Sequence, residues 1–235
     1  MIDYILAHKD FEINENVLGI FPHLKNYQVV SQNEVKCNLP NKLIYKGLDN
    51  RLYGEYSVWE WIYKTNDWER NPFVCLHHYR RLLDRVHNNI SVAAPMRFGC
   101  SIEQQTAHYH GVTVNQILRE VLSKQEYAHL SQSNIFYPYN LFCTNKQLLE
   151  SWLNFIEPKL MKAKEITGAE NLEQMKEYLT HTDLLKPMPN KNTNIDYQSR
   201  LYATICERLN DVFWRTIPQN YFVSNIQFLE EGMNI

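Results

Sequence analysis

Short apolar runs that stop at polar residues predict the strands of a central sheet. Residues 3–7 (DYILA) form such a run before His8 and Lys9, and residues 73–76 (FVCL) form another before the polar string HHYRR at positions 77–81. Ligands of open α/β sheets bind beyond the carboxyl ends of strands, so a site is expected first at these two strand ends. Further strands are expected at residues 27–30, 90–94, 137–144 and 221–229.

Amphipathic spacing predicts helices between these strands. Residues 51–64 carry large apolar side chains at helical spacing, which favours a stripe that faces the core over a ligand platform. Asp49 or Asn50 would cap this helix. The Pro- and Asn-rich residues 184–194 have the length of a mobile flap. Further helices are expected at residues 101–110, 114–130, 145–163, 170–180 and 197–214.

This order of elements predicts one α/β domain over residues 1–235. Its sheet is expected to be central, mostly parallel and flanked by helices, with a helical C-terminal part. A chain of 235 residues with 44% hydrophobic residues is long enough to bury a sizeable core. The 13% aromatic content serves cores and sugar or nucleotide sites alike, so it does not separate these uses.

Charge and cysteine content narrow the classes of partner. The 24 Lys and Arg nearly balance the 26 Asp and Glu, so the formal net charge of −2 creates no global field that would recruit nucleic acid or an anionic membrane. The five cysteines lack the spacing of a zinc site, as expected of reduced thiols. The first residues lack a basic segment followed by a long apolar run, so we expect no signal peptide, and no apolar run approaches the ~18 residues of a membrane helix. We expect a cytoplasmic protein, with peripheral docking at the inner face of a membrane left open.

The sequence lacks the common phosphate-binding loops. Neither GxGxxG nor GxxxxGK[ST] occurs in a chain with only 7 Gly, which argues against a dinucleotide-binding Rossmann enzyme and against a P-loop NTPase. An anion site must then be local, and HHYRR is the densest local set of donors. The alternative is an exposed strand end with solvated arginines, and spacing alone does not decide between them.

Several motifs keep the order of a known family along nearly the whole chain. The strand end His78-Tyr79-Arg80-Arg81 is followed by a later EQ and YH and by a closing helix with an R-x-x-x-x-x-x-E-R pattern. The chain resembles a family of bacterial capsular and exopolysaccharide glycosyltransferases, a domain of unknown function whose members share the HYRR strand. The other matching positions are His8, Lys9, Asp49, Asn50, Glu55, Trp61, Lys64, Glu103, Gln104, Tyr109, His110, Asn140, Arg200, Glu207 and Arg208.

The resemblance implies a GT-A-like glycosyltransferase that uses a nucleotide-diphosphate sugar, with a UDP-sugar in keeping with the family. Galactose or galactofuranose would be moved to a growing surface polysaccharide, with a glycan or a lipid-linked oligosaccharide as acceptor. The residues expected at the acceptor or behind it are His110, Asn140, Arg200 and Arg208. Those expected to bind the donor are His8, Lys9, Asp49, Asn50, Glu55, His78, Tyr79, Arg80 and Arg81.

The leaving diphosphate must be neutralised, and GT-A enzymes commonly use a metal held by an Asp-x-Asp motif. This chain has no Asp-x-Asp. We expect Arg80, Arg81 and His78 to replace the metal through charged hydrogen bonds to phosphate, so metal-independent transfer is favoured and a divalent cation is not excluded. Strand alternation allows only one of the two arginines to reach the donor, unless the strand has already ended.

A reaction that inverts the anomeric centre needs a carboxylate base, and a retaining one does not. Glu103 is the first candidate, although it serves equally well as a capping residue, and Asp84 is the second. Arg200, Glu207 and Arg208 are interpreted as an ion-pair set that holds the last helix to the sheet, with an arginine on the diphosphate as the alternative.

Two further function classes stay open. HHYRR and its aromatic neighbours would suit a nucleic-acid-binding module, although the net charge of −2 argues against it. A non-catalytic member of a glycan-assembly complex would keep the fold without turnover.

Overall fold

The structure is a computed structural model, and it describes residues 1–12, 26–84, 90–182, 194–218 and 220–228. The expected flap at residues 184–194 lies almost wholly outside the described residues, as do residues 85–89 that follow the HHYRR segment. Within the described residues, no helix combines the length and the apolar character that crossing a membrane requires.

The centre of the structure is a mixed sheet. Its strand order is β10-β6-β9-β4-β1-β2-β3, and β5 pairs with both β4 and β11. The run β4-β1-β2-β3 is parallel, whereas β9 and β5 pair antiparallel with β4. The bounds are β1 (Ile2–Leu6), β2 (Tyr27–Ser31), β3 (Lys42–Ile44), β4 (Phe73–His78), β5 (Arg81–Leu83), β6 (Val92–Ala93), β9 (Phe142–Asn145), β10 (Phe222–Val223) and β11 (Ile226–Phe228).

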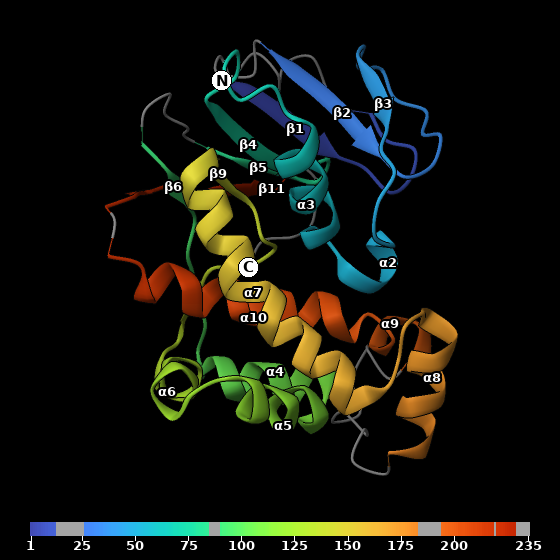
Figure 1. Cartoon of the computed structure of the whole chain (residues 1–235), viewed down its shortest axis with the longest axis vertical. Helices are drawn as coiled ribbons and strands as arrows, with labels where there is room; N and C mark the ends of the chain where they lie inside the picture. The colour runs from blue at the N-terminus through green and yellow to red at the C-terminus, as the bar shows by residue number, and fades with distance from the viewer. Residues whose placement is uncertain (13–25, 85–89, 183–193, 219, 229–235) are drawn as a thin grey trace.

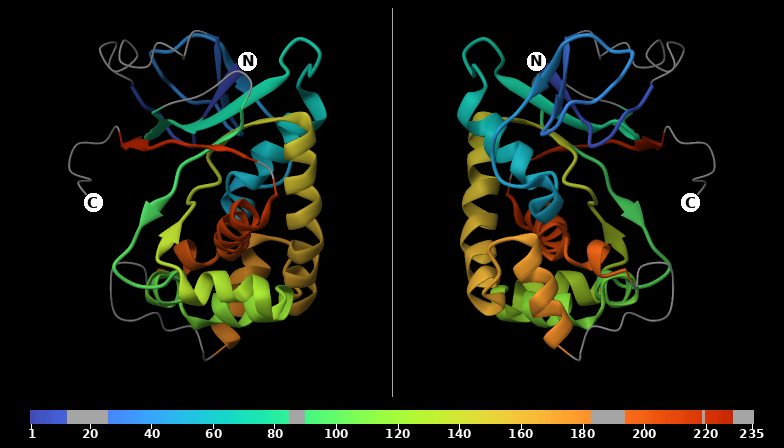
Figure 2. Two further views of the ribbon diagram at one scale, coloured as in Figure 1. Left: turned by 90° about the vertical axis from the view of Figure 1, so that its left-hand side faces the viewer. Right: turned by 90° about the vertical axis from the view of Figure 1, so that its right-hand side faces the viewer.

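Helices cover the sheet and build a layer of their own. In Figure 1 the sheet lies at the top, α10 crosses the middle and α4 to α6 lie at the bottom, while α7 runs from the sheet to the lower layer. The side views in Figure 2 show the same order. The bounds are α2 (Asn50–Tyr53), α3 (Tyr56–Thr65), α4 (Ile102–His110), α5 (Val112–Val121), α6 (Lys124–Gln132), α7 (Lys146–Thr167), α8 (Leu172–His181), α9 (Ile195–Gln198) and α10 (Leu201–Thr216). The prediction of an α/β fold with a helical C-terminal part is confirmed.

Aromatic side chains join the sheet to the helices. Trp59 is fully buried and stacks on Phe142 of β9, with ring centroids 4.2 Å apart, and its indole N–H donates to the Asn140 carbonyl at 2.7 Å. The indole N–H of Trp152 donates to Asn210 at 2.9 Å. Both indole N–H groups therefore have an acceptor, which avoids the cost of burying an unpaired donor. The aromatic stripe predicted for residues 51–64 does form part of the core.

Three helices predicted as continuous are interrupted, and one of them, expected at residues 197–214, is divided at Ser199 and Arg200 into the end of α9 and the helix α10. The helix expected at residues 51–64 stops at Gly54, where the backbone has φ 59° and ψ −147°, and α3 starts after Glu55. The helix expected at residues 114–130 ends at Val121, because Ser123 caps a new helix through a capping box with Glu126. Helical spacing continues across the breaks at Gly54 and before Ser123, so periodicity did not reveal them.

Two strand predictions also needed correction. The strand expected at residues 137–144 starts only at Phe142, because Tyr139 (φ 65°) and Asn140 (φ 48°) have left-handed backbone that strands do not adopt. The strand expected at residues 221–229 is two short strands, one pairing with β6 and the other with β5. Two small strands, β7 (Met96–Arg97) and β8 (Ile135–Phe136), form a separate antiparallel pair.

Candidate functional site

The carboxyl ends of β1 and β4 lie side by side because the strands pair in parallel with Leu6 opposite His78. This register brings the side chains of His8 and His78 together, with their Nε2 atoms 2.9 Å apart. β4 has ended at His78, and Arg81 already belongs to β5. The strand end predicted to carry the site therefore does gather the expected histidines.

Glu55 lies beside the two histidines as a consequence of the break at Gly54. Its carboxylate and the ring nitrogens of His8 and His78 lie within 4.8 Å of one another. The side chain is 5% exposed. Burial, followed by the negative charge of Glu207, raises the pKa of Glu55 to about 7, whereas the charges of Arg200 and Arg81 act in the opposite direction. A carboxyl group in this state exchanges protons near neutral pH.

These three residues offer nitrogen and oxygen donors of the kind that bind zinc. The backbone N–H of Arg80, however, donates to Nδ1 of His78 at 3.3 Å. A neutral histidine whose Nδ1 accepts carries its hydrogen on Nε2, and that nitrogen then has no free lone pair for a metal. As folded, the set is a hydrogen-bonded group surrounded by arginines, which is a poor fit for a cation.

A second group of possible ligands, Asp3, Cys75 and His77, is fully buried in the sheet. Both nitrogens of His77 are engaged, Nε2 with Asp3 at 3.0 Å and Nδ1 with the Leu83 N–H at 3.1 Å. This group ties β4 to β1 and β5, so its role is structural.

A cavity of about 490 Å³ opens between β5 and the helical layer. Charged side chains in its wall are Arg81, Arg200, Glu207 and Arg208. Aromatic rings supply much of the rest, and the Arg81 guanidinium lies 3.9 Å from the centre of the Tyr139 ring. The aromatic residues in the wall are Phe98, Tyr109, Phe136, Tyr139 and Tyr197. The cavity therefore combines anion-binding groups with flat apolar surfaces.

A smaller cavity of about 220 Å³ lies at the ends of β1 and β2. His8, Gln32, Asn33 and Tyr45 contribute to its wall. Arg200 lines this cavity and the larger one, so it lies where the two meet. A ligand with two parts joined by an anionic group would fit this arrangement.

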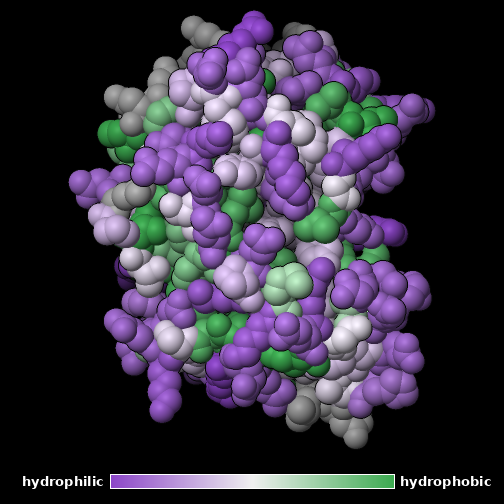
Figure 3. Space-filling view, viewed as in Figure 1, coloured by the Kyte–Doolittle hydropathy of each residue, from purple (hydrophilic) through white to green (hydrophobic). Residues whose placement is uncertain are grey.

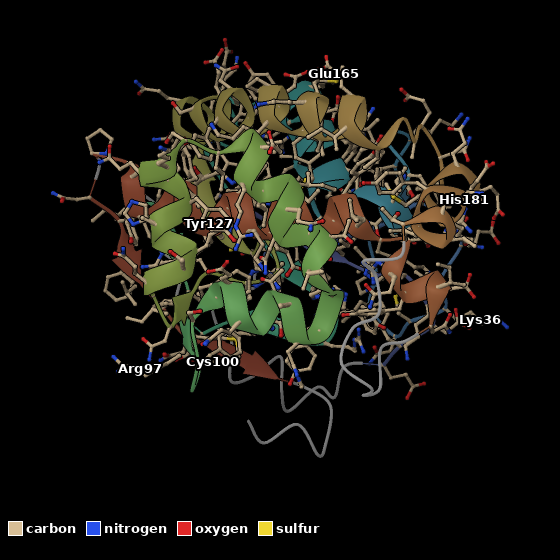
Figure 4. All side chains as sticks on the ribbon, turned by 90° about the horizontal axis from the view of Figure 1, so that it is seen from below. Lys36, Arg97, Cys100, Tyr127, Glu165 and His181 are labelled. Carbon is tan, nitrogen blue, oxygen red and sulfur yellow. The ribbon has the colours of Figure 1, made fainter. Side chains whose placement is uncertain are left out.

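The two predicted catalytic carboxylates lie elsewhere. Glu103 is held in the helical layer, where it pairs with Arg119 and accepts a hydrogen bond from the Tyr127 hydroxyl at 2.7 Å. Figure 4 views this layer from below, with Tyr127 labelled on α6. Asp84 follows β5, and its N–H donates to the Asn225 carbonyl at 2.8 Å. Neither residue lines either of the two cavities.

Two of the predicted donor-binding residues, Asp49 and Asn50, make hydrogen bonds that support the local structure. Asp49 caps α2 by accepting the Arg51 N–H at 2.9 Å, as predicted for the helix start. The Asn50 side chain lines the smaller cavity, and its amide donates to the Gly54 carbonyl at 2.9 Å. Both residues therefore shape the bend that places Glu55.

The remaining donor candidates differ in position. Tyr79 is buried, and its ring packs against Phe11 with centroids 5.2 Å apart. Lys9 is exposed next to His8. Arg81 lines the larger cavity and Arg80 does not, although β4 has already ended before them. One of the two arginines thus reaches the cavity.

The ion-pair set predicted on the last helix is only partly correct. Arg208 is 1% exposed and pairs with Glu207 at 3.2 Å, but its other bonds go to α4, at 2.7 Å to Thr106 and 2.8 Å to Gln105. It therefore holds α10 to the helical layer and not to the sheet. Arg200 is not part of this network and faces the cavities.

His110 and Asn140 were expected near the acceptor. The His110 ring lines the larger cavity and stacks on Tyr197, 5.6 Å between centroids, and burial followed by the charges of Arg208 and Arg200 lowers the pKa of His110 to about 3. Asn140 is fully buried, and its side-chain atoms have no hydrogen-bond partner among the described residues. Its backbone carbonyl receives the Trp59 N–H.

Tyr139 and Tyr197 are cavity residues that the sequence did not single out. The one sequence feature that could have indicated them was the high aromatic content of the chain, which is equally typical of a hydrophobic core. Their positions depend on the left-handed turn before β9 and on the short helix α9, and neither has a clear sequence pattern.

The face of the molecule that Figure 3 draws is mostly polar. On the face drawn in Figure 3, hydrophilic residues dominate and apolar residues form small separate areas.

No family model matches the chain, and no curated protein matches it. Among solved structures, the apo structure of WbbM, a bifunctional glycosyltransferase, is similar, with a TM-score of 0.58 and 14% sequence identity. The match covers 97% of this chain and 45% of WbbM, so the chain spans less than half the length of that protein. The likeness shows that the chain shares its fold with part of a glycosyltransferase. Membership of the HYRR family stays a prediction.

Proposed function

We propose that the protein is a glycosyltransferase that moves a sugar from a nucleotide-diphosphate donor to a carbohydrate acceptor. The observation that carries this proposal is the convergence of Arg81, Arg200 and Glu207 on one cavity between β5 and the helical layer, with Arg200 also lining the smaller cavity at the end of β1. The shared fold with WbbM supports it. A UDP-sugar donor, galactose or galactofuranose transfer and a surface-polysaccharide acceptor rest on the family resemblance.

The two cavities suit the two ends of the donor. The smaller cavity at the ends of β1 and β2 would take the nucleoside, because ligands of α/β sheets bind at this edge. The diphosphate would then lie at the junction, within reach of Arg200 and next to Arg81. Guanidinium groups bind phosphate oxygens through paired hydrogen bonds and stabilise the charge that develops on the leaving diphosphate.

The larger cavity would hold the transferred sugar and the acceptor. Its aromatic rings offer flat apolar surfaces for the C–H faces of sugars, and its volume lies within the range typical of ligand sites. His110 stays neutral beside Tyr197, so it adds a polar contact without a charge.

In an inverting reaction, the acceptor hydroxyl oxygen bonds to the anomeric carbon while the bond from that carbon to the diphosphate breaks. The bonding pair leaves with the diphosphate, and the hydroxyl proton goes to a carboxylate. We assign this base to Glu207, which faces the larger cavity, in place of Glu103 and Asp84. If configuration is retained, the base is not needed.

Binding of nucleotide sugars tests the proposal directly. A panel of UDP-, GDP- and dTDP-sugars would be titrated calorimetrically, and turnover would be followed by release of the nucleoside diphosphate. We expect one donor class to bind, and Arg81→Gln or Arg200→Gln to weaken its binding by about 10- to 100-fold, because each removes a charged hydrogen bond to phosphate.

Arg70→Gln is the matched control, since Arg70 is exposed in the turn before β4 and lies outside both cavities. It should bind like the wild type. Absence of binding to every donor, or wild-type affinity in the double variant of Arg81 and Arg200, would contradict the proposal.

A further inference from the structure

The hydrogen bonds of the histidine pair determine where each hydrogen lies. The Arg80 N–H donates to Nδ1 of His78 at 3.3 Å, so neutral His78 carries its hydrogen on Nε2. That hydrogen points to Nε2 of His8, 2.9 Å away, which must accept it. Neutral His8 then carries its own hydrogen on Nδ1.

Adding a proton to either histidine would break this arrangement of hydrogen bonds. A proton on His78 would occupy Nδ1 and face the Arg80 N–H, while a proton on His8 would occupy Nε2 and face the hydrogen of His78. In both cases two N–H groups would point at each other within hydrogen-bond distance. The pair is therefore held neutral by its geometry.

The charges around the pair act in the same direction. Loss of hydration, followed by the charges of Arg200, Arg80 and Arg81, lowers the pKa of His8 to about 4. Burial and the same arginines, together with His8, lower the pKa of His78 well below its usual value. The Glu55 carboxyl group lies within 4.8 Å of both ring nitrogens, and its own raised pKa weakens its support for a histidine cation.

The remaining N–H of His8 is available to a ligand. Among the described residues, His78 is the hydrogen-bond partner of the His8 ring. His8 is exposed and lines the smaller cavity. Arg200 lines the same cavity and attracts anions to it. A neutral N–H donor beside a guanidinium suits a phosphate oxygen.

We propose that His8 is a permanently neutral N–H donor to a phosphate oxygen of the bound nucleotide, and that His78 is the positioning residue that holds His8 in the required tautomer. The phosphate partner rests on the proposed function, whereas the tautomer does not. His8 is accordingly a binding group and does not serve as the general base at neutral pH.

Imidazole ¹⁵N NMR of the full chain tests the tautomer without any ligand. We expect the His8 signals to show a protonated Nδ1 and an unprotonated Nε2 throughout pH 5.5 to 8, with assignment from the His8→Gln spectrum. A hydrogen on Nε2 of His8, or titration of His8 with a midpoint between pH 6 and 7, would overturn the proposal.

Addition of UDP or inorganic pyrophosphate then tests the phosphate contact. We expect the Nδ1–H signal of His8 to move, and His8→Gln to weaken UDP binding by about tenfold, the value of a hydrogen bond to a charged group. If UDP binds and the His8 signal does not move, the donor role is wrong although the proposed function survives. If neither ligand binds, the phosphate contact and the proposed function both fail, while the tautomer is still decided by the ligand-free spectra.

Substitution of His78 separates positioning from packing. His78→Leu should release His8 to titrate nearer its usual pKa, whereas His78→Gln keeps an N–H donor and should largely restore the neutral tautomer. His181→Gln, at the exposed end of α8 (Figure 4), is the matched control and should leave His8 unchanged. An unchanged His8 titration in folded His78→Leu would contradict the positioning role.

Discussion

Glu55 is a buried carboxyl group whose ionisation depends strongly on its place in the fold. Its usual pKa of 4.5 is raised to about 7, mainly by burial and then by Glu207. Between these two values the unfolded chain releases the proton while the folded chain keeps it, so the free energy of unfolding falls as pH rises. The stabilising contribution is complete below about pH 4.5 and is lost as pH rises through about 7.

We expect Glu55→Gln to remove this part of the pH dependence. The free energy of unfolding would be measured with urea at pH 5 and at pH 8. Between these two pH values it should fall on the order of 2 to 3 kcal/mol more for the wild type than for the variant, at about 1.4 kcal/mol per pKa unit. Exposed Glu69→Gln is the control and should follow the wild type. Parallel stability curves for wild type and Glu55→Gln would show that Glu55 ionises normally.

At the scale of elements, the bend between α2 and α3 places Glu55 in the site. Gly54 has a positive φ of 59°, and a Cβ at this position would lie 2.9 Å from Cβ of Ala203 on α10. Both the backbone conformation and the close approach of α10 therefore require glycine. Asn50 and Ser57 fasten the bend by donating to the Gly54 carbonyl at 2.9 and 2.8 Å.

Gly54→Ala should consequently lower the free energy of unfolding by about 2 to 4 kcal/mol, from backbone strain plus overpacking. Gly99→Ala is the matched control, because its Cβ would meet nothing within 4 Å, and its effect should stay within about 0.5 kcal/mol. In the double variant Gly54→Ala, Ala203→Gly, the part of the lost free energy of unfolding that comes from the clash with Ala203 should be recovered, while the part from backbone strain should remain. Denaturant unfolding of the four proteins provides the comparison, and equal stability of Gly54→Ala and Gly99→Ala would refute this account of the bend.

Across the whole molecule, the site combines distant parts of the chain. His8 follows the first strand, Arg81 opens β5, and Arg200 and Glu207 belong to the last long helix and its start. The formal net charge is −2, yet the arginines concentrate positive charge at this one place. A ligand that bridges these parts stabilises the fold as a unit.

We therefore expect UDP to raise the melting temperature in the presence of EDTA. At 100 times its dissociation constant UDP adds about 2.7 kcal/mol, which corresponds to roughly 5 to 10 °C for a chain of this size. Because arginines supply the charge, manganese or magnesium should add no further stabilisation, and transfer should persist in EDTA. Loss of binding or transfer in EDTA with recovery on adding manganese would show that a metal is required.

Much of the secondary structure follows from the sequence because local periodicity determines it. The strands before His8 and His77 were predicted within a few residues, and the cap of α7 at Asn145 coincides with the predicted helix start. The breaks at Gly54 and before Ser123 were missed, since helical spacing persists across both. A single glycine within a helical pattern does not by itself predict that the helix is interrupted.

The sequence by itself determined the α/β class and the HHYRR strand end, because apolar runs and polar strand ends are local patterns. Only the tertiary structure decided which charged groups share a cavity, since the parallel register of β1 and β4 and the crossing of α10 are long-range. That packing brought Glu55 and Arg200 toward the histidine pair, placed Glu207 in the wall of the larger cavity, and held Glu103 in an ion pair within the helical layer. Contacts between residues more than a hundred positions apart depend on which faces are buried against each other, and no local pattern specifies them.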